Sequence, residues 1–242
     1  MRLYDYNWMQ LEAYLREDDR VVVPLGSVEQ HAYLSLGTDA IVAERCAIEA
    51  AEGTAVPVLP VLPFGLTPRF TEYPGTITLR PGVYVEVVRD VLDGLVAHGF
   101  GRMLLVSGHV GNAPALDVAR DWQREHPDTQ VLFHGGLAEP SVWALANEVD
   151  AEAGHASWVE NFPWTRVGAA PTPKDRKPMV DRGALRAASA TRMRELLGDG
   201  SFGGPYAMSD DTMGELWAAL VADVREALFN GWTDNASTGS HE

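Results

Sequence analysis

Short, continuously apolar runs alternate along the chain with longer segments of helical periodicity. The apolar runs predict strands at residues 20–25, 102–106 and 130–134, and a run interrupted by prolines at 56–62 predicts an irregular edge strand. Continuously apolar runs suit strands that are buried on both faces, and short connections between strand and helix favour parallel pairing. The sequence therefore predicts an α/β fold with a mainly parallel sheet that helices cover on both faces.

Helical periodicity predicts the segments that cover this sheet. Helices are expected at residues 38–53, 81–100, 113–125, 142–149, 184–197 and 212–229. Thr38 and Asp39 resemble an N-cap pair at the start of the first of these helices, and Gly99 is the expected end of the second. One α/β core of this size is common, so residues 1–234 are predicted to form a single domain and 235–242 a disordered tail.

Composition excludes several classes of partner. The chain has 242 residues, a formal net charge of -15 and no long run of Lys and Arg, so nucleic acid is not an expected partner. The longest apolar runs are broken by prolines, and the first residues lack the apolar core of a secretory signal. We therefore expect no membrane association and a cytoplasmic location, and the acidic balance favours a neutral or cationic small molecule as the substrate. The single cysteine, Cys46, is expected to be a buried core residue.

Residues that suit a metal site follow the first predicted strand. Glu29 and His31 are separated by one residue, so an extended loop can direct both side chains the same way, and Asp39 lies at the start of the next helix. Taken singly, Asp39 is more often a helix cap and Glu29 a solvated loop residue. The metal interpretation gains support because His109 follows another strand, and the carboxyl ends of parallel strands share one edge of the sheet. Acids and histidines together suit zinc, manganese or iron(II).

A third cluster, at residues 154–161, contains His155 and Glu160. Residues five apart do not share a helix face, so these two side chains reach a common site only from a bend or loop. Aromatic residues near this cluster are candidate covers for a ring-shaped substrate, although tryptophans are more often core residues. These aromatic residues are Trp143, Trp158 and Trp164.

Several motifs, in order along the chain, resemble those of the creatininase (creatinine amidohydrolase) family. They are PLGSVEQHAYLSLGTD at 24–39, YPGTITL at 73–79, HGF at 98–100, GHVGN at 108–112, HASWVE at 155–160, GGPYA at 203–207 and GE at 214–215. The resemblance implies a three-layer αβα fold and a centre of one or two divalent ions, zinc being expected before manganese or iron. It also implies hydrolysis of a cyclic amide or a related C–N bond, and a homo-oligomer, commonly a hexamer.

Carried over position by position, the resemblance implies a role for six residues. Glu29, Asp39 and His109 would hold one ion. His31 and the bridging Asp39 would hold the second. Glu160 matches a family glutamate, a candidate ligand of the second ion and a candidate catalytic residue, and His155 matches the position that handles protons during ring opening. The hypothesis is that water activated by the metal attacks a carbonyl carbon and that His155 protonates the leaving nitrogen.

Three departures separate this chain from creatininase itself. Gly111 stands where creatininase has a glutamate of its second metal site, and Gly154 where it has an acidic residue beside the catalytic histidine. The loop from Glu29 to Asp39 is shortened, with Ala-Tyr-Leu at 32–34 in place of Gly-Pro-His. Creatinine is therefore not the expected substrate. The alternatives are a hydrolase of a formamide or a cyclic ketone, a non-catalytic metal-binding relative, and a nucleotide- or sugar-binding module, which the lack of a phosphate-binding glycine motif disfavours.

Overall fold

The structure is a computed structural model that describes residues 1–168 and 171–233. Its helices and strands are α1 (Trp8–Tyr14), β1 (Arg20–Leu25), α2 (Thr38–Ala50), α3 (Pro81–Ala97), β2 (Arg102–Ser107), α4 (Pro114–Glu125), β3 (Gln130–His134), α5 (Pro140–Val149), α6 (Arg182–Ala187), α7 (Ala190–Leu197) and α8 (Asp210–Asn230). Single 3₁₀ turns are η1 (Leu3–Asp5), η2 (Pro68–Phe70), η3 (Val110–Asn112), η4 (Gly136–Ala138) and η5 (Trp158–Glu160). The tail predicted at 235–242 lies outside the described residues.

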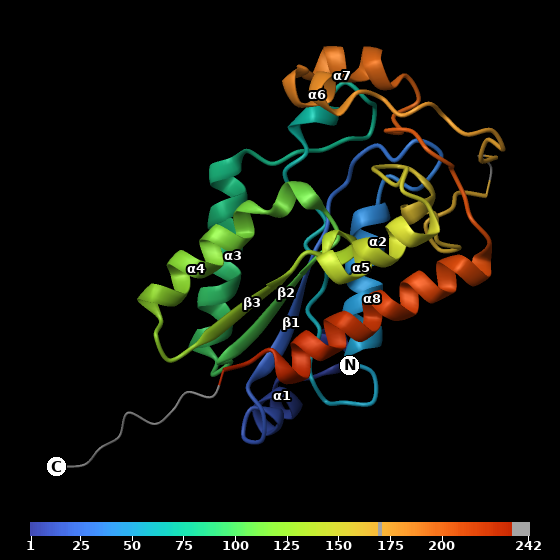
Figure 1. The fold of residues 1–242 in the computed structure, drawn as a ribbon. Helices are drawn as coiled ribbons and strands as arrows, with labels where there is room; N and C mark the ends of the chain where they lie inside the picture. The colour runs from blue at the N-terminus through green and yellow to red at the C-terminus, as the bar shows by residue number, and fades with distance from the viewer. Residues whose placement is uncertain (169–170, 234–242) are drawn as a thin grey trace.

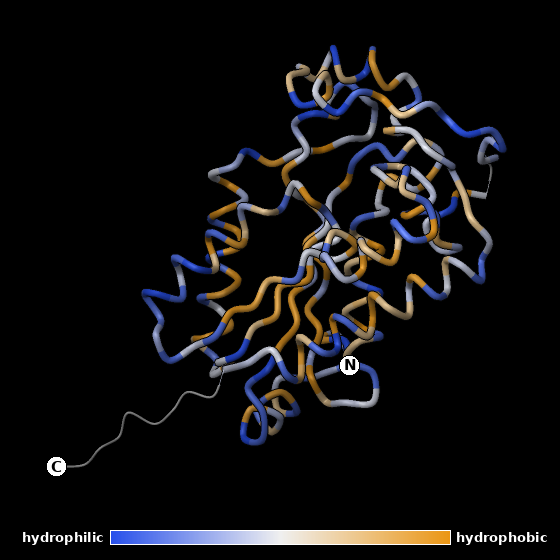
Figure 2. Tube along the Cα trace, in the orientation of Figure 1, coloured by the Kyte–Doolittle hydropathy of each residue, from blue (hydrophilic) through white to orange (hydrophobic). Residues whose placement is uncertain are grey.

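The centre of the fold is a three-stranded sheet in the order β1-β2-β3, with both pairs parallel. The register pairs Val23 with Leu105 and Leu105 with Phe133. After their first residue, β1 and β2 are buried throughout. This burial explains their apolar sequences, which Figure 2 shows as adjacent hydrophobic traces.

Helices cover both faces of the sheet, with α3 and α4 on one side and α2, α5 and α8 on the other (Figure 1). Alternate residues of β2 supply the two cores, because successive side chains of a strand point to opposite faces. Leu104 and Val106 pack with α2 and α8, whereas Met103 and Leu105 pack with α3 and α4. The predicted α/β architecture with a parallel sheet is confirmed.

The proline-rich segment at 56–62 is not a regular strand. It touches β1 through two isolated parallel bridges, Val22 to Val58 and Leu25 to Leu62. Pro57 and Pro60 have no backbone N–H to donate, so a continuous ladder does not form. The segment therefore lies along the free edge of β1 without extending the sheet.

Two helix predictions also differ from the structure. The helix expected at 184–197 is two helices, α6 and α7, and the side chain of Ser189 caps α7 by accepting a hydrogen bond from the backbone N–H of Arg192. The N-cap of α2 is Gly37, so Thr38 and Asp39 lie in the first turn of the helix. The Asp39 carboxylate is therefore free to face the carboxyl edge of the sheet.

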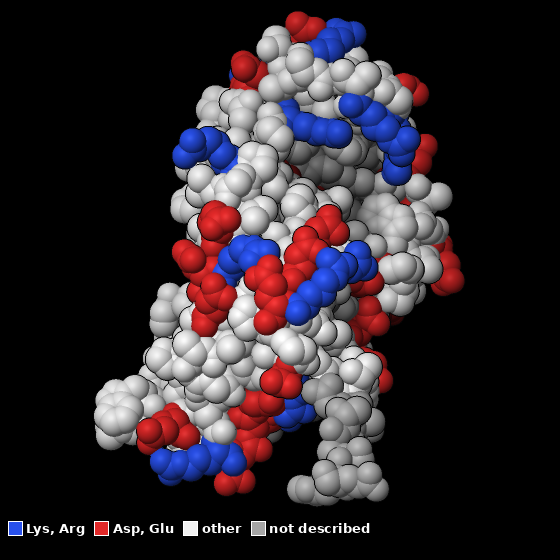
Figure 3. Space-filling view, turned by 90° about the vertical axis from the view of Figure 1, so that its left-hand side faces the viewer, with Lys and Arg blue, Asp and Glu red and all other residues white. Residues whose placement is uncertain are grey.

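Charged side chains of both signs are interspersed over the face of the molecule that Figure 3 shows. Among the described residues, no helix has the length and apolar character needed to cross a bilayer.

Candidate metal centre

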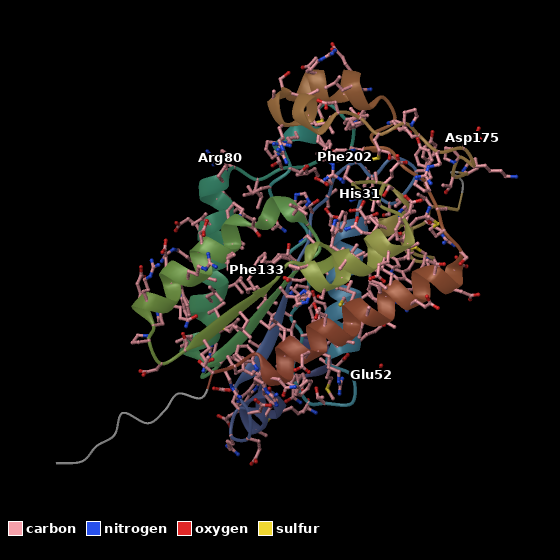
Figure 4. The ribbon with its side chains drawn as sticks, viewed as in Figure 1. His31, Glu52, Arg80, Phe133, Asp175 and Phe202 are labelled. Atoms are coloured by element: carbon pink, nitrogen blue, oxygen red, sulfur yellow. The ribbon has the colours of Figure 1, made fainter. Side chains whose placement is uncertain are left out.

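Two tight approaches bring the loops after β1 and β2 against the start of α2. A Cβ atom on Gly26 would lie 2.5 Å from the Cα of Ala40, and one on Gly108 would lie 2.1 Å from the main-chain oxygen of Asp39. Both distances are too short for any side chain, so glycine is required where the loops pass the helix. Figure 4 shows His31 beyond the end of the sheet.

The residues predicted to bind metal converge in two groups that share Asp39. Ligand atoms of Glu29, Asp39 and His109 lie within 4.8 Å of one another. The same holds for His31, Asp39 and Glu160. Asp39 presents one oxygen to each histidine, with Oδ1 at 3.0 Å from His31 Nε2 and Oδ2 at 2.9 Å from His109 Nδ1. The geometry suits one or two ions bridged by this carboxylate.

Hydrogen bonds outside the cluster determine which nitrogen of each histidine ring faces it. His109 Nε2 donates to the main-chain oxygen of Leu66 at 3.0 Å, and His31 Nδ1 donates to the main-chain oxygen of Glu29 at 3.1 Å. When the ring is neutral, as metal binding requires, its other nitrogen therefore directs a lone pair at the carboxylates. Metal-binding histidines are oriented in this way by a hydrogen bond from the second nitrogen.

Two atoms of the cluster have no hydrogen-bond partner among the described residues. Glu29 is 1% exposed and His31 is 1% exposed, yet Glu29 Oε2 and His31 Nε2 form no hydrogen bond. The 3.0 Å contact of His31 Nε2 with Asp39 lacks the alignment of a hydrogen bond. A buried polar atom without a partner is costly. A divalent cation would satisfy both atoms, and the oxygen and nitrogen donors present fit such an ion.

Mutual electrostatics shift the pKa values of these groups in opposite directions. Burial alone lowers the pKa of His31, but Asp39, Glu160 and Glu29 outweigh it and raise the pKa to about 10. Burial likewise lowers the pKa of His109, and Asp39 with Glu29 raises it to about 9. Burial raises the pKa of Asp39, but the two histidines reverse this and hold it far below its ordinary value. The cluster therefore attracts positive charge, whether protons or a metal ion.

His155 and Glu160 enter this cluster from a bend, as their spacing requires. His155 Nδ1 lies 3.6 Å from Glu29 Oε1, and Glu160 Oε2 lies 3.8 Å from His31 Nε2. Ala156, between them, has φ of 54°, and its N–H donates to Glu160 at 2.6 Å. Burial raises the pKa of Glu160 to about 7, whereas burial and the charge of His31 lower the pKa of His155 well below its ordinary value.

The aromatic residues beside His155 are not the tryptophans suggested by sequence proximity. Phe70 stacks on the His155 ring with centroids 4.6 Å apart and an interplanar angle of 14°, and the Phe202 ring lies 5.2 Å away. Trp158 is fully buried in the core on the α2 and α8 face, where Trp164 stacks on Phe162 at 5.3 Å. Trp143 also packs against this core, so the alternative that the tryptophans are core residues applies. No local sequence signal pointed to Phe70 or Phe202.

The sequence also gave no indication of several supporting side chains. Ser27 Oγ donates to Asp39 Oδ2 at 2.8 Å. The Gln30 side chain contacts His155 at 2.8 Å. These residues belong to the same motif or neighbouring loops, but their contacts depend on the folded path of the loops.

Comparison with known proteins gives one family. The family model described as creatininase, creatinine amidohydrolase, matches residues 4–228. The creatinine amidohydrolase of Pseudomonas putida is 27% identical over 116 residues, which make up 45% of each chain. The 3-dehydro-scyllo-inosose hydrolase of Thermotoga maritima is 26% identical over 102 residues, which make up 41% of this chain and 33% of that protein. The matched segments span less than half of either curated relative.

Solved structures share the fold over almost the whole chain. A creatinine amidohydrolase (creatininase) has a TM-score of 0.74 at 19% identity, over 93% of this chain and 95% of that one. A provisionally assigned creatinine amidohydrolase from Bacteroides fragilis has a TM-score of 0.77 at 22% identity, over 94% of both chains. Two other creatininase structures are described as a Zn-Zn type and as an Mn form. These similarities confirm the predicted fold.

Proposed function

The chain belongs to the creatininase family, and from this premise we propose that it is a metal-dependent amidohydrolase that opens a cyclic amide or a related C–N bond. The observation that carries the proposal is the pair of ligand groups joined by Asp39, in which buried atoms of Glu29 and His31 have no hydrogen-bond partner within residues 1–168 and 171–233. Zinc is the first expected metal, with manganese or iron as alternatives, because all three accept mixed oxygen and imidazole ligands.

The metal ligands in this proposal are Glu29, Asp39 and His109 for one ion, and His31, Asp39 and Glu160 for a second. The departure at Gly111 supports the place of Glu160 in this set. A Cβ on Gly111 would lie 2.2 Å from His109 Nε2 and from the main-chain oxygen of Leu66, so a glutamate there requires both to move. Glu160, 3.8 Å from His31 Nε2, offers a carboxylate from another loop.

When bound by these residues, a divalent ion would supply a Lewis acid and would lower the pKa of a water molecule from 15.7 to about 7. During hydrolysis the water oxygen adds to the carbonyl carbon and loses a proton, the C–N bond breaks, and the leaving nitrogen gains a proton. The carboxyl of Glu160, whose pKa burial raises to about 7 in the metal-free protein, is the proposed carrier of that proton where only the first ion binds. His155, whose Nδ1 faces the cluster at 3.6 Å from Glu29, is proposed to hydrogen-bond the leaving group, because its lowered pKa keeps the ring neutral.

The surroundings of His155 argue against creatinine as the substrate. Gly154 stands where creatininase has an acidic residue. A Cβ on Gly154 would lie 3.4 Å from the Cβ of Phe202, so a side chain at this position would meet an aromatic residue. Phe70 stacks on the His155 ring, so aromatic side chains stand beside this histidine in place of an acidic one. We propose a neutral substrate in preference to a cationic one.

A second candidate is ring opening of a cyclic ketone, which the relative named 3-dehydro-scyllo-inosose hydrolase suggests. A formamide is a further alternative within the same metal chemistry. The absence of an acidic residue at Gly111 and Gly154 also leaves a non-catalytic, metal-binding protein as a rival. We also propose that the protein forms a homo-oligomer, up to a hexamer, and that it is located in the cytoplasm.

The experiment is metal removal by exhaustive chelation, followed by zinc or manganese addition and assay on a panel of lactams, formamides and cyclic ketones. We expect turnover of a lactam that disappears with the metal and returns with it. His155→Gln should keep the metal and lose turnover, while Asp117→Asn, on the exposed face of α4, should change neither. Turnover of a ketone alone supports the second candidate. Full metal occupancy without any turnover supports the non-catalytic rival.

A further inference from the structure

Gln30 lies between Glu29 and His31 in the loop after β1, and it contacts the ring of His155 with two different groups. Its side-chain Nε2 is 2.8 Å from His155 Nε2, and its main-chain oxygen is 3.0 Å from the same ring nitrogen. A ring nitrogen with a hydrogen donates to the oxygen, whereas one with a lone pair accepts from the amide. The tautomer of His155 therefore depends on which contact prevails.

The amide orientation of Gln30 is fixed by two other hydrogen bonds. Its Oε1 accepts from the backbone N–H of Ala32 at 3.1 Å, and its Nε2 donates to the main-chain oxygen of Gly200 at 3.0 Å. Turning the amide over would place two donors together at Ala32 and two acceptors together at Gly200. The amide therefore keeps its nitrogen, and not its oxygen, at 2.8 Å from His155 Nε2.

Packing prevents the ring and the amide from avoiding each other. Phe70 stacks on the His155 ring, with centroids 4.6 Å apart, and Phe202 lies 5.2 Å from it on a different loop. On the far side of the amide, a Cβ on Gly200 would lie 1.7 Å from Gln30 Oε1, and the φ of Gly200 is 105°. Gln30 is 4% exposed, and the main chain at Gly200 leaves its amide no room to move away from His155.

We propose that Gln30 is a positioning residue that holds neutral His155 with its hydrogen on Nδ1, so that the ring presents an N–H to the metal pocket. This arrangement is the opposite of that in His31 and His109, whose lone pairs face the carboxylates. A ring nitrogen that carries a hydrogen is not a metal ligand. His155 is therefore excluded from coordination, although its Nδ1 lies within 4.8 Å of ligand atoms of Glu29 and His31.

The consequence for the reaction rests on the proposed function. An N–H fixed on one side of the pocket donates a hydrogen bond to the oxygen or the nitrogen of a bound amide without first reorienting the ring. Gln30 acts only through His155 and touches no reacting atom.

The test is a long-range 1H–15N correlation spectrum of the zinc-loaded, 15N-labelled protein, which distinguishes the two neutral tautomers of a histidine. The signals of His155 are assigned by their loss in His155→Gln. We expect the Nδ1–H form as the major species in the wild-type chain. Gln30→Met removes the amide donor and leaves the main-chain oxygen as the partner, so the Nε2–H form should become the major species. Gln123→Met, which removes an amide beside β3, should leave the pattern unchanged.

A wild-type spectrum with the hydrogen on Nε2, or with Nδ1 bound to zinc, overturns the proposal. The wild-type result decides it even where a variant fails to fold, and an unchanged tautomer in folded Gln30→Met also contradicts it. Because the spectrum needs no substrate, its outcome is separate from that of the lactam assay. The expected tautomer with no turnover rejects the proposed function alone, whereas turnover with the other tautomer rejects this inference alone.

Discussion

Replacing Asp39 with asparagine is expected to abolish tight binding of the metal at both proposed positions. Asp39 is 3% exposed and belongs to both ligand groups, and its oxygens lie 3.0 Å and 2.9 Å from His31 Nε2 and His109 Nδ1. Asparagine keeps the size of the side chain and an oxygen that can accept from Ser27 Oγ, but it removes the negative charge. The substitution therefore isolates the contribution of charge.

The distances set the size of the effect. Two unit charges 3.0 Å apart interact by about 5.5 kcal/mol at an effective dielectric constant of about 20. Removing one member of a buried ion pair costs about 3–5 kcal/mol in practice, which is within this limit. In the metal-loaded protein the cation takes the place of the histidine protons as the positive partner of Asp39. At about 1.4 kcal/mol for each factor of ten, zinc affinity should fall by roughly 10²- to 10⁴-fold.

The assay is competition for zinc against a chromophoric chelator, with the bound zinc counted by mass spectrometry after dialysis. Asp117→Asn is the matched control, since it makes the same chemical change at a side chain that is 81% exposed on α4. The control should bind zinc as the wild type does. An Asp39→Asn variant that is folded and binds zinc within twofold of wild type would show that the shared carboxylate is not a ligand.

Three other predictions follow from the same cluster. With pKa values of about 10 and about 9, His31 and His109 are protonated below pH 9 in the metal-free protein, so zinc binding at pH 7 should release protons. Zinc affinity should then rise with pH by about tenfold per unit for each proton released. Calorimetry in buffers of different ionisation enthalpy measures the released protons, and binding without proton release contradicts the prediction. Glu160→Gln should lower the zinc content by one ion where the wild type holds two, and an unchanged count removes Glu160 from the ligand set. Gly108→Ala would place a Cβ 2.1 Å from the main-chain oxygen of Asp39, so it should lower the free energy of unfolding by about 1–3 kcal/mol and weaken zinc binding. The control, Gly94→Ala, has open space around it in α3 and should leave the free energy of unfolding unchanged or raise it. Urea unfolding measures both variants.

The sheet and the ends of its strands were predictable because burial on both faces leaves a continuous apolar sequence. The strands at 20–25 and 130–134 match β1 and β3, and the second strand extends one residue beyond the predicted 106 to Ser107. Short glycine-containing loops directly after two of these strands then place Glu29, Asp39 and His109 at one edge. The family resemblance added His155 and Glu160, whose spacing alone gave only weak evidence.

The contacts that were not predictable join residues far apart in sequence. Phe70, His155 and Phe202 come from three loops, and their stacking depends on how each loop returns over the sheet. The break between α6 and α7 was hidden because helical periodicity continues across Ser189, whose side chain caps the second helix. Gln30 offered no signal, because an amide is informative only when its partners are known.

Anomalous diffraction from crystals of the zinc-loaded protein, recorded on both sides of the zinc absorption edge, tests the central claim of a metal centre most directly. The account predicts a peak among Glu29, Asp39 and His109, and, where a second ion binds, another among His31, Asp39 and Glu160. Absence of a peak at these residues in zinc-loaded crystals, or a peak coordinated by His155 Nδ1 in place of Asp39, would contradict it.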